Sequence, residues 1–321
     1  MAYIALIGLG AGAASAMLFA SVASGSLISI LLFYLAPLPI LIAALGWSHW
    51  AALIAALAAA AGLTAALGGY FFFAFLFGVG LPAWWLGYLA LLARSGPTGD
   101  LDWYPLGRIV LWAAIFGTLV VVAAIPTLGP DEETFRATLR NGFERIVRAQ
   151  GQTPAPPPRS GDAETTGRLI DFLVGVIPPA AAVLSTVINL IDLWLAGRIV
   201  RLSGRLSRPW PDLAEIRLPP ITPLLLAAGV VGCFVPGLLG IMAGVFVATL
   251  LVIYAMTGLA VLHFITRGMT SRGLLLGGTY TALLVFGWPV LLMTLFGLVD
   301  AAVDLRNRTA RRGGPPSSPI T

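Results

Sequence analysis

Several stretches of this chain are apolar and uncharged over the length that a helix needs to cross a lipid bilayer. Residues 3–22 contain no charged side chain, and about 20 apolar residues are enough for one spanning helix. Backbone N–H and C=O groups cannot stay unpaired in lipid, and a helix pairs them within its own segment. The sequence therefore predicts an all-α fold, a polytopic bundle of transmembrane helices.

Composition and charge exclude several other classes of protein. The chain is 58% apolar and 10% charged, whereas soluble domains average about 25% charged residues. It contains no lysine, which excludes a P-loop of the GxxxxGK[ST] type and any Schiff-base lysine. The net charge of +5 therefore comes from arginines, which stand between apolar runs and not beside stacking aromatics. This pattern favours membrane topology over nucleic-acid binding.

Residues for metal or nucleophilic chemistry are scarce. Cys233 is the single cysteine, and His49 and His263 are the two histidines, too few for a transition-metal site. We find no nucleophile–base pair and no acidic motif for lipid chemistry, so an enzyme ranks third among the functional classes. We predict no cofactor, no metal and no catalytic residue.

The apolar runs divide the chain into two halves of five spans around one polar insertion. Residues 1–127 form the first half and residues 167–308 the second, with residues 309–321 as a disordered tail. Prolines at 37 and 39 predict a kink in span 2. In the second half we place breaks near Pro236-Gly237 and at 287–289, which gives short spans 7, 9 and 10. Nine spans are the competing count. The predicted spans cover residues 3–22, 27–46, 49–67, 70–93, 107–127, 169–198, 221–266 (two spans) and 273–305 (two spans).

Residues 128–166 form the long polar insertion, which we place on the extracytoplasmic side. Gly129-Pro130-Asp131 is typical of a helix start. Apolar residues then recur at helical spacing, which predicts an amphipathic helix at the membrane surface; a partner-binding helix is the alternative. The following stretch, TPAPPPRSGDAETTG, is typical of a flexible or polyproline linker.

Arginines set the predicted orientation. Arg198, Arg201, Arg205 and Arg208 follow span 6, and such clusters mark the cytoplasmic side. With ten spans, both termini are then cytoplasmic, and the protein is expected in the bacterial inner membrane with the lipid bilayer as its partner.

Polar residues inside the spans are the candidate site residues, because ionisable groups there are costly and are often functional. Asn189 and Asp192 share one face of span 6. A structural ion pair between Asp192 and Arg198 or Arg201 is an equally weighted alternative to a functional role. Tyr254 and His263 lie in span 8, where Thr257 and Gly258 would also allow close packing.

A second candidate group lies at the end of span 10. Asp300 and Asp304 share a face there and could bind a proton or a cation. Pairing with Arg306, Arg308 or the basic loop after span 6 is the alternative that we prefer. We expect spans 6 and 10 to meet at their cytoplasmic ends through carboxylate–arginine pairs that involve Arg198 from span 6 and either Arg306 or Arg308 from the end of span 10.

Five strings of sequence also carry a family resemblance: APLPILIAALGW, LPAWWLGYLALLAR, NLIDLWLAGRIVRLSGRLSRPWPDLAEIRLP, MTGLAVLHF and FGLVDAAVDLRNR. Together they resemble the YybS-like bacterial membrane proteins, a family grouped by a domain of unknown function. That family is remotely similar to the substrate-binding membrane subunits of energy-coupling-factor transporters, which bind a small molecule and use a separate ATPase module. The resemblance implies a small-molecule ligand and a membrane or ATPase partner, without a substrate or a catalytic residue set.

Two functions follow as hypotheses. The first is a small-molecule transporter or substrate-binding membrane subunit, and the second is a non-transporting membrane scaffold or assembly factor. A convergent polar cavity between spans 6, 8 and 10 would favour the first, and a solid apolar interior the second.

Overall fold

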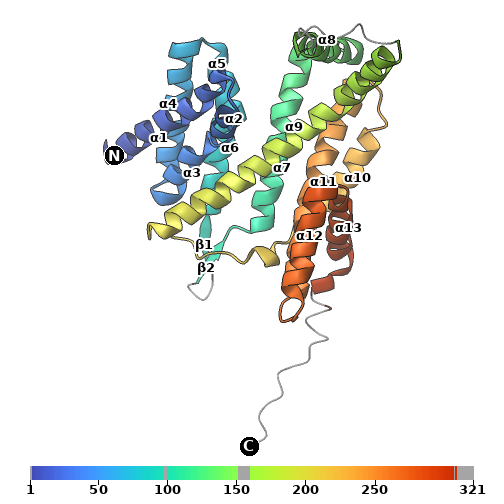
Figure 1. Cartoon of the computed structure of the whole chain (residues 1–321). Coiled ribbons are helices and arrows are strands. Elements are labelled where there is room, and N and C mark those ends of the chain that lie inside the picture. The colour runs from blue at the N-terminus through green and yellow to red at the C-terminus, as the bar shows by residue number, and fades with distance from the viewer. Residues whose placement is uncertain (1, 97–99, 151–159, 307, 309–321) are drawn as a thin grey trace, which may run out of the picture. The chain divides into compact units, whose positions relative to one another are not determined.

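The computed structural model is built almost entirely from helices (Figure 1). It describes residues 2–96, 100–150, 160–306 and 308. Within these residues, strand occurs only in a hairpin between β1 (Ala93–Ser95) and β2 (Leu101–Trp103). The predicted all-α polytopic fold is confirmed.

The described chain forms two compact units. Unit 1 comprises Met1–Ala113, Ile188–Leu225 and Leu250–Thr321, and unit 2 comprises Ala114–Val187 and Leu226–Thr249. Helices α7 (Leu106–Leu128), α9 (Ser160–Leu202) and α11 (Leu238–Ile265) each contribute residues to both units. The predicted division into two halves and an insertion stays a prediction.

The N-terminal part of unit 1 is a bundle of small residues. Helix α1 (Ala2–Ala20) packs closely on α4 (His49–Leu67). At Gly12 the helices are so close that an added Cβ atom would lie 2.6 Å from the Ala55 carbonyl oxygen. The predicted span 2 is divided at its prolines into α2 (Leu27–Tyr34) and α3 (Pro37–Gly46). The predicted span 4 consists of α5 (Tyr70–Phe75), a π-helical turn η2 (Leu76–Gly80) and α6 (Leu81–Ala90). A 3₁₀ turn η1 (Ser21–Ser24) extends α1.

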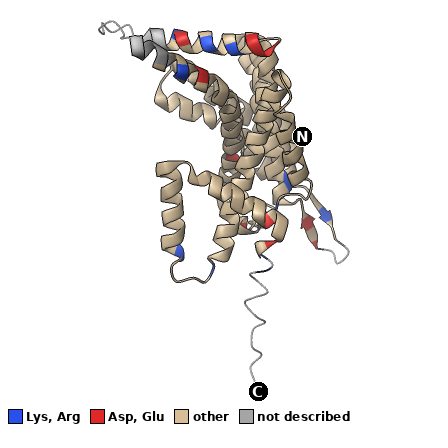
Figure 2. Ribbon diagram, turned by 90° about the vertical axis from the view of Figure 1, so that its right-hand side faces the viewer, with Lys and Arg blue, Asp and Glu red and all other residues tan. Residues whose placement is uncertain are grey.

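Unit 2 contains the helix of the polar insertion. Helix α8 (Glu132–Gln150) begins where predicted, with Thr134 N–H donating to the Asp131 carboxylate over 2.8 Å. Its charged residues stand out against the uncharged helices in Figure 2. Phe135 is buried against Ile125, Ala182 and Val245, so α8 is tied to this unit through its apolar face.

One expectation for the insertion was wrong. Helix α9 begins at Ser160, so the last eight residues of the predicted linker, 160–167, are helical. The prolines of this stretch, at 154 and 156–158, all precede Ser160, so no proline of the linker interrupts a helix that begins there. Residues 151–159 of the linker and the tail 309–321 lie outside the described residues.

The C-terminal helices follow the predicted breaks. Helix α10 (Thr222–Gly232) ends before Pro236, and α12 (Arg272–Phe286) and α13 (Pro289–Val303) are separated at Gly287-Trp288. Among the described residues, seven helical segments are long and apolar enough to cross a membrane. The three other predicted spans correspond to the shorter apolar helices α10, α12 and α13. A 3₁₀ turn η3 (Leu213–Glu215) lies in the segment between α9 and α10.

Candidate functional site, a polar cavity beside helices 11 and 13

Helices α11 and α13 approach each other at backbone distance in unit 1. A Cβ atom on Gly258 would lie 1.9 Å from the Met293 carbonyl oxygen, and one on Gly297 would lie 2.1 Å from that of Tyr254. The Thr294 hydroxyl also donates to the Leu251 carbonyl over 3.3 Å. Small residues permit such close contact between spanning helices. The contact fixes Tyr254 and Thr257 relative to the carboxylates at the end of α13.

The end of α13 folds back on itself through a buried ion pair. Asp304 has a left-handed backbone (φ 52°), which Asp tolerates better than most residues and which ends the helix. Arg306 can then reach back to Asp300, with Nη2 2.7 Å and Nε 3.1 Å from Oδ2. Both side chains are buried, at 2% and 5% exposure.

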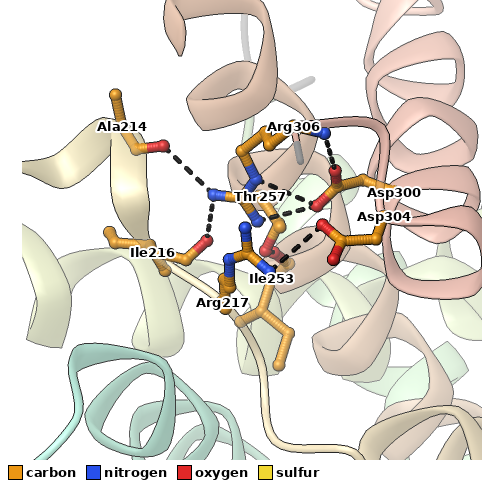
Figure 3. A network of polar contacts seen from close by, with 8 residues as sticks. All are labelled: Ala214, Ile216, Arg217, Ile253, Thr257, Asp300, Asp304 and Arg306. Carbon is orange, nitrogen blue, oxygen red and sulfur yellow. Dashed lines mark hydrogen bonds and ion pairs between the residues drawn. The ribbon is translucent and has the colours of Figure 1, made fainter. Parts of the chain in front are cut away.

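Arg306 also holds the segment that follows α9. Its Nη1 donates to the carbonyls of Ala214 over 3.1 Å and of Ile216 over 2.8 Å (Figure 3). The guanidinium therefore satisfies a carboxylate and two backbone acceptors at once. Removing one partner from such a buried pair costs about 3–5 kcal/mol, because an uncompensated charge is left behind.

A second, more open ion pair lies beside the first. Arg217 Nη1 is 3.1 Å from Asp304 Oδ1, and both side chains are about half exposed (Figure 3). Exposed pairs of this kind contribute little to stability, about 0–1 kcal/mol. The pair therefore sets one positive and one negative side chain, each partly accessible, at the cavity described next.

These four charged residues line a cavity of 350 Å³ together with Tyr254, Thr257 and the prolines that lead into α10. Tyr254 is fully buried, and its hydroxyl has no hydrogen-bond partner among the described residues. The Thr257 hydroxyl donates to the Ile253 carbonyl over 2.9 Å, which leaves its oxygen able to accept. A buried hydroxyl without a partner is costly, so the cavity presents an unmet hydrogen-bonding group.

Of the predicted site residues, Tyr254, Asp300, Asp304 and Arg306 line this cavity together. Sequence reasoning did not include the Ala214 and Ile216 carbonyls, and it included Arg217 only as part of the basic loop after span 6, offered as a partner for these carboxylates. Arg217 stands in the basic stretch after span 6, but nothing in its spacing indicates a carboxylate partner.

Asn189 and Asp192 lie apart from the cavity lining, on one buried face of α9. Asp192 is 1% exposed, and its Oδ2 has no partner among the described residues. The expected pair between Asp192 and Arg198 is therefore not formed at Oδ2, because residues six apart on a helix point in different directions. The Arg198 guanidinium lies over the rings of Trp194 and Trp210.

His263 is also separate from the cavity lining. Its Nε2 is 2.9 Å from the hydroxyl of Tyr280 in α12. His263 and Asn189 remain predicted candidates, and the geometry gives them no shared site with Tyr254.

The segment between α9 and α10 is held at two further points. Arg208 donates to the carbonyls of Ala90 (3.0 Å) and Tyr104 (3.1 Å), and partial burial lowers its pKa. Asp212 accepts from Ala214 N–H and pairs with Arg267. The Ala214 hydrogen bond and the Arg267 guanidinium hold the pKa of the Asp212 carboxyl below 3.8.

Among the described residues, no group of three or more His, Cys, Asp or Glu side chains could hold a metal ion.

Comparison with known proteins identifies the chain at the family level. No curated protein and no solved structure matches the chain. The family model described as "Predicted membrane protein (DUF2232)" matches residues 13–301. The chain belongs to this DUF2232 family of membrane proteins.

Proposed function

We propose that this protein is a small-molecule transporter, or the substrate-binding membrane subunit of one, and that the polar cavity is its binding site. The observation that carries the proposal is the buried Tyr254 hydroxyl, which lines the cavity and has no partner among the described residues. A ligand that accepts or donates a hydrogen bond there would offset the cost of the unpaired group.

The charges of the cavity indicate the kind of ligand. Two arginines and two aspartates line it, so their formal charges cancel. The inner pair is buried and fully bonded, whereas the outer pair, Arg217–Asp304, is half exposed. The ligand class that fits is a small polar molecule without large net charge, such as a zwitterion, which engages Arg217, Asp304 and Tyr254.

Orientation and partners complete the proposal. The positive-inside tendency of the arginines that follow α9 supports an orientation in which the cavity faces the cytoplasmic side of the bacterial inner membrane, with both termini on that side. Because the chain contains no lysine for a P-loop, any ATP-driven transport would need a separate ATPase partner. This agrees with the remote resemblance to substrate-binding subunits that the sequence carries.

Ala301 gives a direct test, because it is exposed and lines the cavity. In a Cys233→Ser background, Ala301→Cys should react with a water-soluble thiol reagent. The small-molecule fraction of a cell extract should slow that reaction. Adding Tyr254→Phe should abolish the protection, whereas Tyr70→Phe, at an exposed tyrosine in α5, should preserve it. Protection that is absent, or equal in all three proteins, would contradict the proposal.

A further inference from the structure

A second cavity in unit 1 differs in character from the polar cavity. It has a volume of 380 Å³ and a lining that is almost wholly apolar, within the range of about 300–1,000 Å³ typical of small-molecule sites. Its walls come from α3, α6, α7, the end of α9, the following segment and α11. Its lining includes Ile191, Trp194, Arg208 and Trp210.

Exposed arginines stand beside this apolar cavity. The Arg198 guanidinium lies 5.5 Å from the Trp210 ring centroid and 5.9 Å from that of Trp194. Arg201 lies 5.2 Å from the same Trp210 ring. Both tryptophans line the cavity, so two cations are held at its edge by the rings that form its wall.

The position of these arginines follows from the end of α9. Gly204 has a left-handed backbone (φ 69°), and Arg205 N–H donates to the Val200 carbonyl over 3.1 Å. This hydrogen-bonding pattern ends a helix and turns the chain back. Trp210 therefore returns to the last turns of α9, where a Cβ atom on Gly197 would lie 3.4 Å from its ring.

These arginines have no acidic partner within the described part of the chain. No described carboxylate pairs with Arg198, Arg201 or Arg205, in contrast to Arg217, Arg267 and Arg306. A guanidinium held over an aromatic ring by a cation–π contact still has N–H groups with which to bind phosphate oxygens. Arg208 differs because two backbone carbonyls occupy it.

We propose that the apolar cavity and Arg198–Arg201 form a binding site for one anionic phospholipid. An acyl chain occupies the apolar cavity, and the headgroup phosphate binds the two guanidiniums. Tryptophan and arginine are suited to this boundary, since both combine an apolar body with a polar end at the membrane interface. The charge of the arginines selects an anionic headgroup, whereas the cavity alone would accept any lipid tail.

The test compares lipid retention by the full-length protein. Delipidated protein is exposed to an equimolar mixture of phosphatidylglycerol and phosphatidylcholine, and the bound lipids are counted by native mass spectrometry. The wild type should retain phosphatidylglycerol preferentially. Arg198→Gln/Arg201→Gln should reduce that preference by about 30-fold, at about fivefold per arginine near an anionic headgroup. Arg272→Gln, at an exposed arginine at the start of α12, should leave it unchanged.

Further variants separate the contribution of the headgroup to lipid binding from that of the acyl chain. Ile191→Trp fills the mouth of the cavity at an exposed position and should lower retention of both lipids, whereas Leu184→Trp elsewhere on α9 should not. Should the double variant fail to fold, Arg201→Gln alone serves the same comparison. Equal preference in wild type and arginine variants would overturn the proposal. Full displacement of the lipid by equimolar inorganic phosphate would also overturn it, in favour of a phosphate-only site.

Discussion

Breaking the buried Arg306–Asp300 ion pair should lower the free energy of unfolding more than breaking an exposed ion pair does. Arg306→Met removes the Nη2 and Nε contacts with Asp300 and the Nη1 contacts with two carbonyls. It leaves a carboxylate that is 5% exposed without its cation. The expected loss of unfolding free energy is about 3–5 kcal/mol, and Asp300→Leu should cost a similar amount.

The double variant Asp300→Leu/Arg306→Met tests whether the loss of stability comes from an uncompensated buried charge. It leaves no uncompensated charge, so it should cost at least about 2 kcal/mol less than the sum of the two single changes. The assay is reversible unfolding in mixed micelles, combined with hydrogen exchange of residues 213–217, which should accelerate whenever Arg306 is absent. The matched control is Arg94→Met/Asp102→Leu, because this pair on the hairpin is exposed at 84% and 60% and should couple by no more than about 1 kcal/mol. Additivity within about 0.5 kcal/mol at Asp300 and Arg306 would refute the reasoning.

Four other predictions follow from the same structure. Gly297→Ala places a Cβ 2.1 Å from the Tyr254 carbonyl oxygen and should cost about 1–3 kcal/mol, whereas Gly277→Ala, in open space within α12, should not lower the melting temperature. Tyr254→Phe should keep or raise stability, because the lost hydroxyl has no described partner; a clear loss in thermal denaturation would show a structural bond instead. The pKa of Asp212 is lowered in the folded protein, so this carboxylate stabilises the fold above its ordinary pKa, and the stabilisation disappears as pH falls through the folded pKa. The unfolding free energy of the wild type should exceed that of Asp212→Asn by at most about 1 kcal/mol at pH 7, and the two values should converge in acid. Cysteines at Ser203 and Ser271 should label from the cytoplasm and one at Asn141 from outside, and Ser203 and Ser271 on opposite sides would contradict the predicted topology.

Much of the fold could be predicted because lipid leaves few alternatives. Apolar length determines where spanning helices lie, and the breaks before Pro289 and near Pro236 follow from proline and glycine chemistry. The hairpin at Ala93–Trp103 and the early start of α9 at Ser160 were missed. Both lie in polar segments, where hydrophobic periodicity gives no signal.

The candidate site was less predictable because its partners are distant in sequence. The composition of span 10 indicated that Asp300 and Asp304 would need arginines. The particular pairing depends on the left-handed turn at Asp304, which no periodicity reports. Arg217 reaches Asp304 across 87 residues. Helical spacing likewise could not show that the Arg198 guanidinium would lie over the Trp210 ring, since that contact requires the chain to reverse at Gly204.

The most direct test of the polar cavity is native mass spectrometry of protein extracted in mild detergent. We expect a small-molecule adduct on the wild type that is absent from Tyr254→Phe and present on Tyr70→Phe. It should also persist in Arg198→Gln/Arg201→Gln, which separates it from a bound lipid. A wild-type protein without a small-molecule adduct, or one whose adduct survives Tyr254→Phe, would contradict the proposed binding site.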